Sequence, residues 1–356
     1  MKVGPKGGLI IFPLDVKFGI LFFATKSRDR CACSSVFKAA VAVEKYGFDS
    51  FWAIGLGQWV AGDPMIISAA AASNTRKLRM GICGFNPLSM YPARAAGALS
   101  MLDNISGGRL IVGIGSFPKN PFAMGKWRVP ADRYDKPVGR MLETIELWKK
   151  LWTEKNVSYN GKFYKVENYS LSLKPSTKPH PPIWINGKGP RMLRITATLG
   201  NGWISGVPIR GLISPARYQE SLTEIRRMAE SAGRDPKEIE PSVLALTSIS
   251  LDHNAALKLF EREDRRYLVR WGLHKELGYK EPWKQPEDVP LEAIEKWKIE
   301  KRIFGTPDEC MEKIEKYIEA GVRHFIFGIH AANEDGFFNA IKLYGEKVIP
   351  YFKGKQ

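Results

Sequence analysis

The most constraining feature of this chain is the alternation of helical and strand-forming sequence between residues 63 and 115. Two short runs rich in β-branched and apolar residues, 78–85 and 109–114, each follow a segment with helical character. Each run is followed by Gly, Asn or Pro, which interrupt strands. Strands that alternate with helices are typical of parallel sheets with helical crossovers. The stretch therefore predicts a βαβα arrangement.

The same alternation continues along the rest of the 356-residue chain. Expected strands, marked by short apolar runs, cover residues 15–24, 48–54, 78–85, 109–114, 182–186, 202–206, 243–251 and 324–329. Expected helices, marked by helical periodicity, cover residues 33–46, 63–74, 93–104, 137–152, 190–199, 215–232, a segment from 254 onward, 306–320 and 335–352. Eight βα units predict an α/β fold of the TIM (β/α)8 barrel type.

Three segments do not fit the βα repeat and are expected to decorate the barrel. Residues 116–135 follow the fourth strand and are rich in Pro, Lys and aromatic residues, which predicts a long functional loop. Residues 156–174 precede the fifth strand and predict a β-hairpin that turns at the Asn-Gly pair, residues 160–161. Residues 271–301 precede the last βα unit and carry three Trp. We expect one barrel domain over residues 1–356 that contains all three insertions.

The charge of the chain does not by itself identify a partner. The net charge is +17, yet Lys and Arg alternate with Asp and Glu along the expected helices, as in residues 309–320, without a nucleic-acid-binding motif. No apolar run reaches the roughly 20 residues that cross a bilayer, and the N-terminal segment lacks a signal-peptide cleavage site. We expect a cytoplasmic protein that acts on a small molecule and binds neither nucleic acid nor membrane. Abundant Lys, Glu and Ile favour an archaeal or thermophilic origin.

The four cysteines predict neither a disulfide framework nor a metal site. Cys31 and Cys33 form a CAC triplet, whereas Cys83 and Cys310 stand alone. A zinc site requires paired Cys or His ligands at close spacing, and the chain has no such pairs. We expect reduced thiols and no bound metal.

The strongest indication of a binding site is the sequence WINGKGPRM at residues 184–192. A glycine-rich turn here leads from a strand into a helix, whose free N–H groups and dipole favour a phosphate. The residues expected to bind a cofactor phosphate are Asn186, Gly187, Lys188, Gly189, Pro190 and Arg191. The alternative is a tight βα turn without a ligand, which has the same sequence shape.

Other candidates follow from the rule that the site of a TIM barrel lies over the carboxyl ends of its strands. Candidate cofactor contacts at the end of the third strand are Cys83, Gly84, Phe85 and Asn86. Trp203, Trp59 and Trp127 could stack on a ring, although buried tryptophans more often belong to the core. His330 and Asn86 are the candidate catalytic residues, although a loop histidine is often structural. The Cys83 thiol could equally be a small buried group of the core.

Three sequence blocks closely resemble the bacterial-luciferase-like superfamily: NTRKLRMG at residues 74–81, LDNISGGR at 102–109 and GIGS at 113–116. Residues 181–203 resemble the phosphate-binding segment of the superfamily, and the segments at residues 136–175 and 181–194 are most similar to the branch of methylenetetrahydromethanopterin reductases and phthiodiolone ketoreductases. The resemblance implies a TIM barrel that uses coenzyme F420, or alternatively FMN. It also implies hydride transfer between the F420 deazaflavin and an organic acceptor, for which the branch suggests a methylene-tetrahydropterin.

The resemblance further implies how the cofactor lies. Its phosphate would bind near residues 187–191, and its ring would pack against a non-prolyl cis peptide between Cys83 and Gly84. Tryptophans of the insertions at 116–135 and 271–301 would wall off a flat substrate such as a pterin. Relatives commonly form dimers through the second and third helices, and the alanine-rich second helix is compatible with close backbone approach.

The chain departs from its relatives where they carry acid–base groups. Leu21, Gly55 and Phe117 stand where relatives often have carboxylates or an Asp-His pair. Hydride transfer to a cationic iminium needs no proton donor, whereas reduction of a ketone favours a general acid. Three interpretations therefore stay open: an F420-dependent reductase, an FMN-dependent monooxygenase and a non-catalytic cofactor-binding protein.

Overall fold

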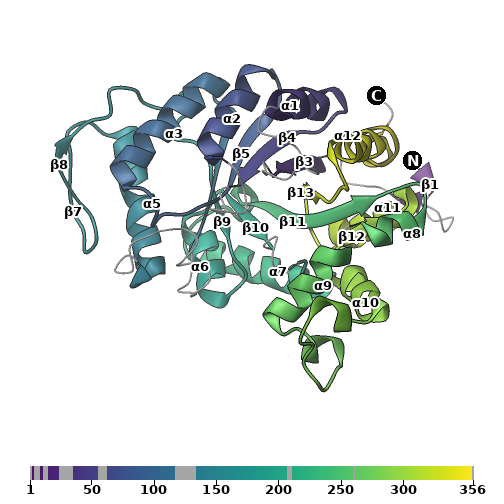
Figure 1. The fold of residues 1–356 in the computed structure, drawn as a ribbon. Helices are drawn as coiled ribbons and strands as arrows, with labels where there is room; N and C mark the ends of the chain where they lie inside the picture. The colour runs from purple at the N-terminus through teal and green to yellow at the C-terminus, as the bar shows by residue number, and fades with distance from the viewer. Residues whose placement is uncertain are drawn as a thin grey trace.

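The computed structural model describes residues 2–3, 9–10, 15–23, 35–54, 62–116, 134–206, 211–259 and 261–354. Parallel strands form a closed barrel at the centre of the molecule (Figure 1). The eight strands of the barrel are β3 (Lys17–Phe22), β4 (Ser50–Ile54), β5 (Arg79–Phe85), β6 (Leu110–Gly115), β9 (Ile183–Asn186), β10 (Gly202–Ser205), β11 (Glu240–Ile249) and β13 (His324–Ile329). The sheet closes because β13 pairs with β3 and β11, and β11 also pairs with β10. The predicted TIM barrel is confirmed.

Helices surround the barrel on its outer side (Figure 1). They are α1 (Val36–Lys45), α2 (Pro64–Ser73), α3 (Pro92–Ser106), α5 (Pro137–Thr153), α6 (Pro190–Leu199), α7 (Pro215–Ser231), α8 (His253–Lys258), α11 (Pro307–Glu319) and α12 (Glu334–Leu343). After α12, a π-helical turn (Tyr344–Val348) leads into α13 (Ile349–Lys353). Proline is the first residue of α2, α3, α5, α6, α7 and α11, where its fixed φ suits a helix start.

The amino end of α11 shows the predicted cap. The Thr306 hydroxyl accepts a hydrogen bond from the Glu309 N–H at 3.4 Å, and the Glu309 carboxylate accepts one from the Thr306 N–H at 2.7 Å. This reciprocal pair satisfies two N–H groups that the helix itself leaves without partners. The helix start read from Thr306, Pro307 and Glu309 is confirmed.

The predicted hairpin is present, but its turn differs from the expected one. Strands β7 (Val157–Asn160) and β8 (Lys165–Tyr169) are joined by residues 161–164 rather than by the Asn-Gly pair alone. The reason lies on α5, where the Glu143 carboxylate accepts hydrogen bonds from the N–H groups of residues 162, 163 and 164 at 2.7, 2.9 and 3.2 Å. This contact holds the longer loop and attaches the hairpin to the barrel.

The insertion before the last βα unit starts earlier than expected. Helices α9 (Glu261–Trp271) and α10 (Leu291–Lys301) form a helical unit with two short 3₁₀ turns, η5 (Lys275–Leu277) and η6 (Pro286–Asp288), that extends away from the barrel (Figure 1). Its separate core comprises Leu268, Leu277, Val289, Ala293, Ile294 and Trp297. The single helix expected from residue 254 onward is instead two helices: α8 ends after six residues, and α9 begins at Glu261.

Four smaller elements complete the fold. The unpredicted strand β12 (Ile303–Gly305) pairs with the carboxyl end of β11. Strands β1 (Lys2–Val3) and β2 (Leu9–Ile10) form a small antiparallel pair, and η4 (Pro236–Glu238) precedes β11. Most of the predicted insertion at 116–135 lies outside the described residues.

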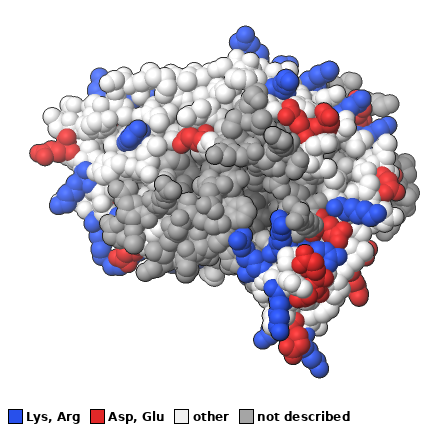
Figure 2. Space-filling model, viewed as in Figure 1, with Lys and Arg blue, Asp and Glu red and all other residues white. Residues whose placement is uncertain are grey.

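The described surface mixes both signs of charge. On the face that Figure 2 shows, Lys and Arg are interspersed with Asp and Glu. Among the described helices, none is both long and apolar enough to cross a membrane. Within the same residues, no three His, Cys, Asp or Glu side chains come together as a potential metal site.

A buried polar network occupies the amino end of the barrel. The Glu240 carboxylate at the start of β11 lies 3.3 Å from Lys17 Nζ and 3.3 Å from an Arg79 nitrogen. The Nδ1 atom of His324 lies 3.0 Å from the same carboxylate, and its Nε2 atom lies 2.7 Å from the Ser50 hydroxyl. One carboxylate thus joins β3, β5, β11 and β13.

The order serine, histidine, carboxylate resembles a hydrolase triad, but its setting is structural. Ser50 and His324 are both completely buried, and the Ser50 oxygen also accepts a hydrogen bond from Trp52 Nε1 at 2.8 Å. The network lies at the amino end of the barrel strands, the face associated with stability rather than catalysis. We therefore assign it to barrel closure.

The pKa values of Glu240 and His324 in this network are both lowered. Burial opposes ionisation of Glu240, but the hydrogen bond and charge of His324 and the charges of Lys17 and Arg79 lower its pKa to about 2. Burial also lowers the pKa of His324, against the opposing contribution of Glu240. A neutral His324 can donate from Nδ1 to Glu240 and accept at Nε2 from Ser50. Protonation of either group therefore favours the unfolded chain.

Replacing Glu240 with Gln should lower the free energy of unfolding at neutral pH by about 2–4 kcal/mol, because Lys17 and Arg79 lose their shared carboxylate. The contribution of Glu240 is complete above its ordinary pKa of 4.5 and should disappear as the pH falls toward 2. Urea unfolding of both proteins across this range measures the effect. The matched variant Glu238→Gln, whose carboxylate side chain is 60% exposed, should change stability by less than about 0.5 kcal/mol. A constant difference between the wild type and Glu240→Gln at all pH values would contradict the assignment.

Candidate active site

The carboxyl ends of the barrel strands define the place of an active site in this fold. Residues 24–34, 55–61, 117–133 and 207–210, which follow β3, β4, β6 and β10, lie outside the described residues. The candidates Trp59 and Trp127 fall in these segments, as do Gly55 and Phe117. The site is therefore built from the ends of β5, β9, β10, β11 and β13.

The turn between β9 and α6 has a constrained backbone. Gly187 has φ +154°, and a Cβ atom added there would lie 2.8 Å from the side chain of Met192. The Gly187 carbonyl accepts a hydrogen bond from Trp203 Nε1 at 2.7 Å, and its N–H donates to the Ile204 carbonyl at 3.3 Å. Two groups of β10, the Trp203 indole and the Ile204 carbonyl, thus hold the turn in place. Glycine is required here by both backbone angle and space.

The amino end of α6 faces open space. Its capping residue, Gly189, has no side chain that could accept the N–H groups of the first turn, and an added Cβ there would meet no atom within 4 Å. Lys188 and Arg191 are exposed on either side of it. A ten-residue helix with an uncapped, accessible amino end and two adjacent cations fits an anionic group such as a phosphate.

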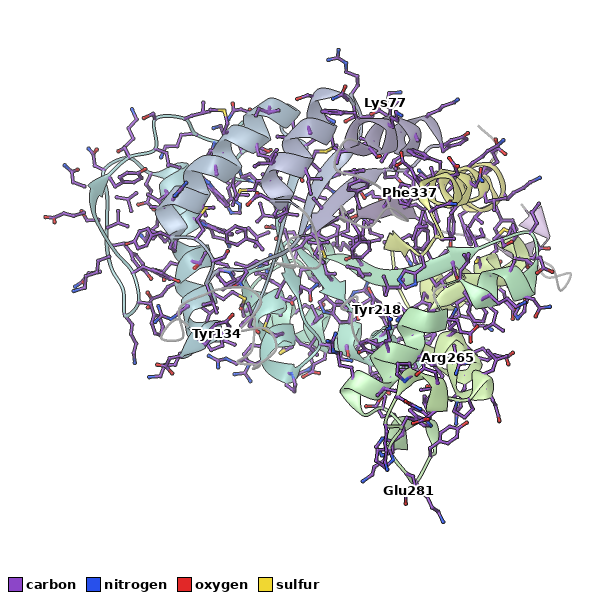
Figure 3. All side chains as sticks on the ribbon, viewed as in Figure 1. Lys77, Tyr134, Tyr218, Arg265, Glu281 and Phe337 are labelled. Carbon is purple, nitrogen blue, oxygen red and sulfur yellow. The ribbon has the colours of Figure 1, made fainter. Side chains whose placement is uncertain are left out.

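Two other predicted cofactor residues near this turn have different environments. Asn186 is half-buried and pairs in register with Gly115 of β6. Trp203 is completely buried and stacks on Tyr218 of α7 with ring centroids 4.7 Å apart (Tyr218 is labelled in Figure 3). The indole of Trp203 therefore supports the turn from below. Because the indole of Trp203 is completely buried, it presents no exposed ring face on which a ligand could stack in this arrangement.

The end of β5 contains a bulge, but not the predicted cis peptide. The pairing of β5 with β6 shifts register between Ile82 and Phe85, and Gly84 has φ +76°. Among the described residues the cis peptide bond is Lys178–Pro179, so the expectation of a cis bond between Cys83 and Gly84 is wrong. A trans bond suffices because a glycine with positive φ already produces the bulge.

The side chains beside this bulge are apolar or already engaged. Burial raises the pKa of the Cys83 thiol to about 12, so the group stays protonated and is a poor nucleophile. Phe85 is buried and packs edge-on against Trp148 at 5.1 Å. Asn86 accepts the Leu88 N–H at 3.0 Å through its side-chain oxygen, which stabilises the loop after β5. Of these candidates, half-buried Gly84 leaves backbone accessible to a ligand.

His330 is the candidate acid–base group of the described strand ends. It follows β13, its backbone N–H donates to the Thr247 carbonyl at 2.7 Å, and the residue is 9% exposed. None of the other described barrel strands ends in a carboxylate. Their last residues are Phe22, Ile54, Phe85, Gly115, Asn186, Ser205 and Ile249. The described part of the site therefore suits chemistry that needs little proton transfer.

Ser205 is a candidate that sequence reasoning did not single out. It ends β10 and is completely buried, and its hydroxyl has no hydrogen-bond partner among the described residues. A buried hydroxyl without a partner is costly, so a polar ligand atom at this end of the barrel would satisfy it. A serine at the end of a predicted strand was the available signal, but serines are common and the missing partner is visible in three dimensions alone.

Comparison with known proteins identifies the family of this barrel. The sequence model of the luciferase-like monooxygenase family matches residues 16–324, and the chain belongs to this family. The predicted superfamily is thus confirmed, and with it the class of protein, an oxidoreductase built on a TIM barrel.

Three relatives show the range of the family. The chain is 26% identical to the F420-dependent glucose-6-phosphate dehydrogenase of Nakamurella multipartita, over 95% of this chain and 97% of the relative. It is 27% identical to the 5,10-methylenetetrahydromethanopterin reductase of Archaeoglobus fulgidus, over 79% of this chain and 85% of the relative. The solved structure of the coenzyme F420-dependent tetrahydromethanopterin reductase from Methanopyrus kandleri has a TM-score of 0.79 at 23% identity and covers 95% of this chain and 100% of that one. The structural match supports the fold.

Replacing Gly187 with Ala should lower the free energy of unfolding by about 1–3 kcal/mol, because the backbone angle and the Met192 contact both exclude a Cβ atom. The matched variant Gly189→Ala, at φ −80° with open space around it, should change stability by less than about 0.5 kcal/mol. Denaturant unfolding of the two variants measures the difference. Equal stabilities would show that the β9–α6 turn is not constrained as described.

Proposed function

We propose that this chain transfers a hydride between coenzyme F420 and a small organic substrate. The observation that carries the proposal is the accessible amino end of α6, where Lys188 and Arg191 flank an uncapped helix start. The F420-dependent glucose-6-phosphate dehydrogenase and the coenzyme F420-dependent reductase named above support the choice of cofactor. When bound, F420 supplies the hydride-carrying carbon of its deazaflavin ring.

The spacing of two features supports a ligand that has both a phosphate and a ring. The β9–α6 turn and the bulge at Gly84 are separated by one strand, β6. Neighbouring strands lie about 4.8 Å apart, so the two features are about 10 Å from one another. A phosphate held by Lys188 and Arg191 would place an attached ring over the accessible backbone of Gly84. The hydroxyl of Ser205 would lie on the same end of the barrel, beside the β9–α6 turn and on the side away from Gly84.

The side chains of the site support an acceptor that is already electrophilic. The described strand ends offer His330 as an acid–base group and no carboxylate. Reduction of an iminium carbon consumes a hydride and leaves a neutral amine, so it requires no proton at the same step. A methylene-tetrahydropterin has this chemistry, and the reductase relative of Archaeoglobus fulgidus acts on such a compound by its name. We therefore place a pterin first among the substrates to test.

We further propose a homodimer through α2 and α3. Ile66 on α2 is 71% exposed, and Met101 and Ile105 on α3 are 51% and 44% exposed. Large apolar side chains on two adjacent helices form a surface that a second copy could cover. Sedimentation of the wild type and of Ile66→Glu measures this association, and a wild-type monomer would contradict it.

Titration of the purified protein with F420 and with FMN tests the cofactor. We expect F420 to bind at least about 10-fold more tightly, and the double variant Lys188→Ala, Arg191→Ala to weaken F420 binding by about 10-fold or more through loss of charge-assisted contacts. Arg194→Ala, an exposed arginine one turn further along α6, is the matched control and should change binding by less than about 2-fold.

The outcomes of this titration separate the alternatives. Preference for FMN would favour the monooxygenase interpretation, and binding of F420 without turnover of any acceptor would favour a non-catalytic protein. If neither cofactor binds, or if the double variant binds like the Arg194→Ala control, the phosphate site at α6 is wrong.

Replacement of His330 with Ala tests the class of acceptor. For reduction of a methylene-tetrahydropterin with reduced F420, we expect kcat to fall by less than about 10-fold, because an iminium needs no general acid; loss of a general acid typically costs about 100- to 10,000-fold. His253→Ala serves as the control, because the His253 imidazole is engaged with the Glu309 carboxylate 2.9 Å away. A decrease of 100-fold or more confined to His330→Ala would show that His330 acts as a general acid in this reduction and would contradict the proposed iminium chemistry.

A further inference from the structure

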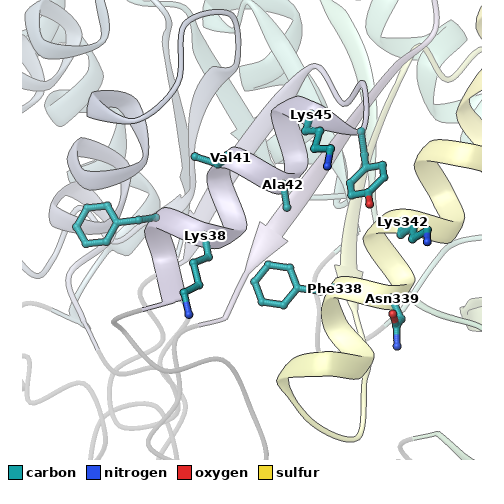
Figure 4. A pocket seen from close by; sticks show the side chains of 9 residues that line it. Lys38, Val41, Ala42, Lys45, Phe338, Asn339 and Lys342 are labelled. Atoms are coloured by element: carbon teal, nitrogen blue, oxygen red, sulfur yellow. The ribbon is translucent and has the colours of Figure 1, made fainter.

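A surface groove lies between α1 and α12, away from the strand ends that form the candidate active site (Figure 4). Its volume is about 570 Å³, and its apolar lining consists of Phe37, Val41, Ala42, Tyr46 and Phe338. Phe37 and Val41 are each 48% exposed, although apolar side chains of this size are usually covered. The two helices follow neighbouring parallel strands, β3 and β13, and are therefore packed side by side.

Three lysines border this apolar surface, and none of the described residues that line it is a carboxylate. Lys38 and Lys45 come from α1 and Lys342 from α12. Figure 4 shows Lys38 and Lys45 separated along α1, with Lys342 on the facing helix. No ion pair joins any of the three to a carboxylate within the described residues.

Two acidic side chains of the same helices, Glu44 and Glu334, are engaged elsewhere, whereas Asp335 in the first turn of α12 is exposed. The Glu44 carboxylate accepts the N–H groups of residues 76, 77 and 78 at 2.9, 2.6 and 3.2 Å. Glu334 at the start of α12 accepts the Ser35 hydroxyl at 2.8 Å. The positive charge beside the groove is therefore not neutralised by these residues, and the net charge of the whole chain, +17, has the same sign.

The placement of the charges distinguishes between classes of ligand. Lys38 and Lys45 are seven residues apart, which corresponds to about 10 Å along a helix. A single-headed anionic lipid would use the cations at one end of the groove and would need its chain enclosed, whereas this groove is open along its length. Cations on both flanks of the groove, from α1 and from α12, instead match an amphipathic helix with carboxylates on both sides of its apolar face.

We propose that the α1–α12 groove binds a helix of a partner protein, with an apolar stripe packed on Phe37, Val41 and Phe338 and flanking Asp or Glu side chains paired with the lysines. The long-range attraction of a basic protein for an acidic partner would raise the rate of association. The proposal concerns a surface separate from the cofactor site and holds whichever cofactor binds there.

The probe is a fluorescein-labelled, stapled helical peptide with Leu at positions i, i+3, i+4 and i+7 and Glu at the flanking positions. Fluorescence anisotropy with the full-length protein should show saturable binding that weakens as salt is raised. A peptide with the same Leu stripe but Lys in place of Glu, and a peptide of the same composition without the stripe, should each bind at least 10-fold more weakly.

Variants of the chain test where the peptide binds. The triple variant Lys38→Glu, Lys45→Glu, Lys342→Glu should weaken binding by about 10-fold or more, as should Val41→Asp. The control is a triple variant of equal charge change at exposed lysines outside the groove, Lys77→Glu, Lys155→Glu, Lys237→Glu, and it should change binding by less than 2-fold. Circular dichroism melting confirms that each variant is folded, and Val41→Asp provides a second arm if the triple variant is not.

Several results would overturn the proposal. Equal loss of binding in both triple variants would show a non-specific charge effect, and absence of binding by the acidic peptide would exclude the proposed partner class. The protein could also be sedimented with vesicles that contain phosphatidylglycerol. If this co-sedimentation depended on the three groove lysines while the peptide did not bind, the surface would be assigned to a membrane instead. Dissociation of a dimer by Val41→Asp would assign it to a second copy of the chain.

Discussion

Closure of the eight-stranded sheet is the constraint on which the rest of the structure depends. Pairing of β13 with β3 joins segments that are about 300 residues apart in the sequence, and pairing of β10 with β11 completes the ring. At the amino end of the barrel, the Glu240 carboxylate holds Lys17, Arg79 and His324 from three other strands. Because the strands are parallel, closure at one end also brings all their carboxyl ends together at the other. The candidate active site exists because of that closure.

The two ends of the barrel divide their chemistry differently. The amino end contains charges and hydrogen bonds that satisfy one another in the core, so they contribute to stability and leave no group free to react. The described strand ends at the opposite face are mainly glycine, serine, asparagine and apolar residues, with an accessible helix start at Gly189. In the function proposed above, this face would bind an anion and contact a flat ring through its backbone, and His330 would be the candidate for proton transfer. Such a site is suited to hydride transfer, in which the cofactor supplies the reacting atom.

Much of the fold could be predicted because it depends on local sequence. The last barrel strand, His324–Ile329, and the helix Pro190–Leu199 have the predicted bounds, since apolar periodicity and a proline at the helix start specify them within a short stretch. The cap at Thr306 was predictable for the same reason. Errors arose where a distant group intervened. Glu143 on α5 determines the hairpin loop, and a separate small hydrophobic core holds residues 261–301 in a helical unit of their own.

The sequence by itself determined the βα repeat, the superfamily and the glycine-rich turn at residues 186–191, because strand and helix propensity and turn chemistry operate over a few neighbouring residues. Tertiary structure alone decided which side chains meet. It buried Trp203 beneath the turn, left the Ser205 hydroxyl without a partner and formed the bulge at Gly84 with a trans peptide. It also placed α1 beside α12, where lysines from the two ends of the chain border one groove. These features depend on contacts between residues far apart in the sequence, and no local pattern records such contacts.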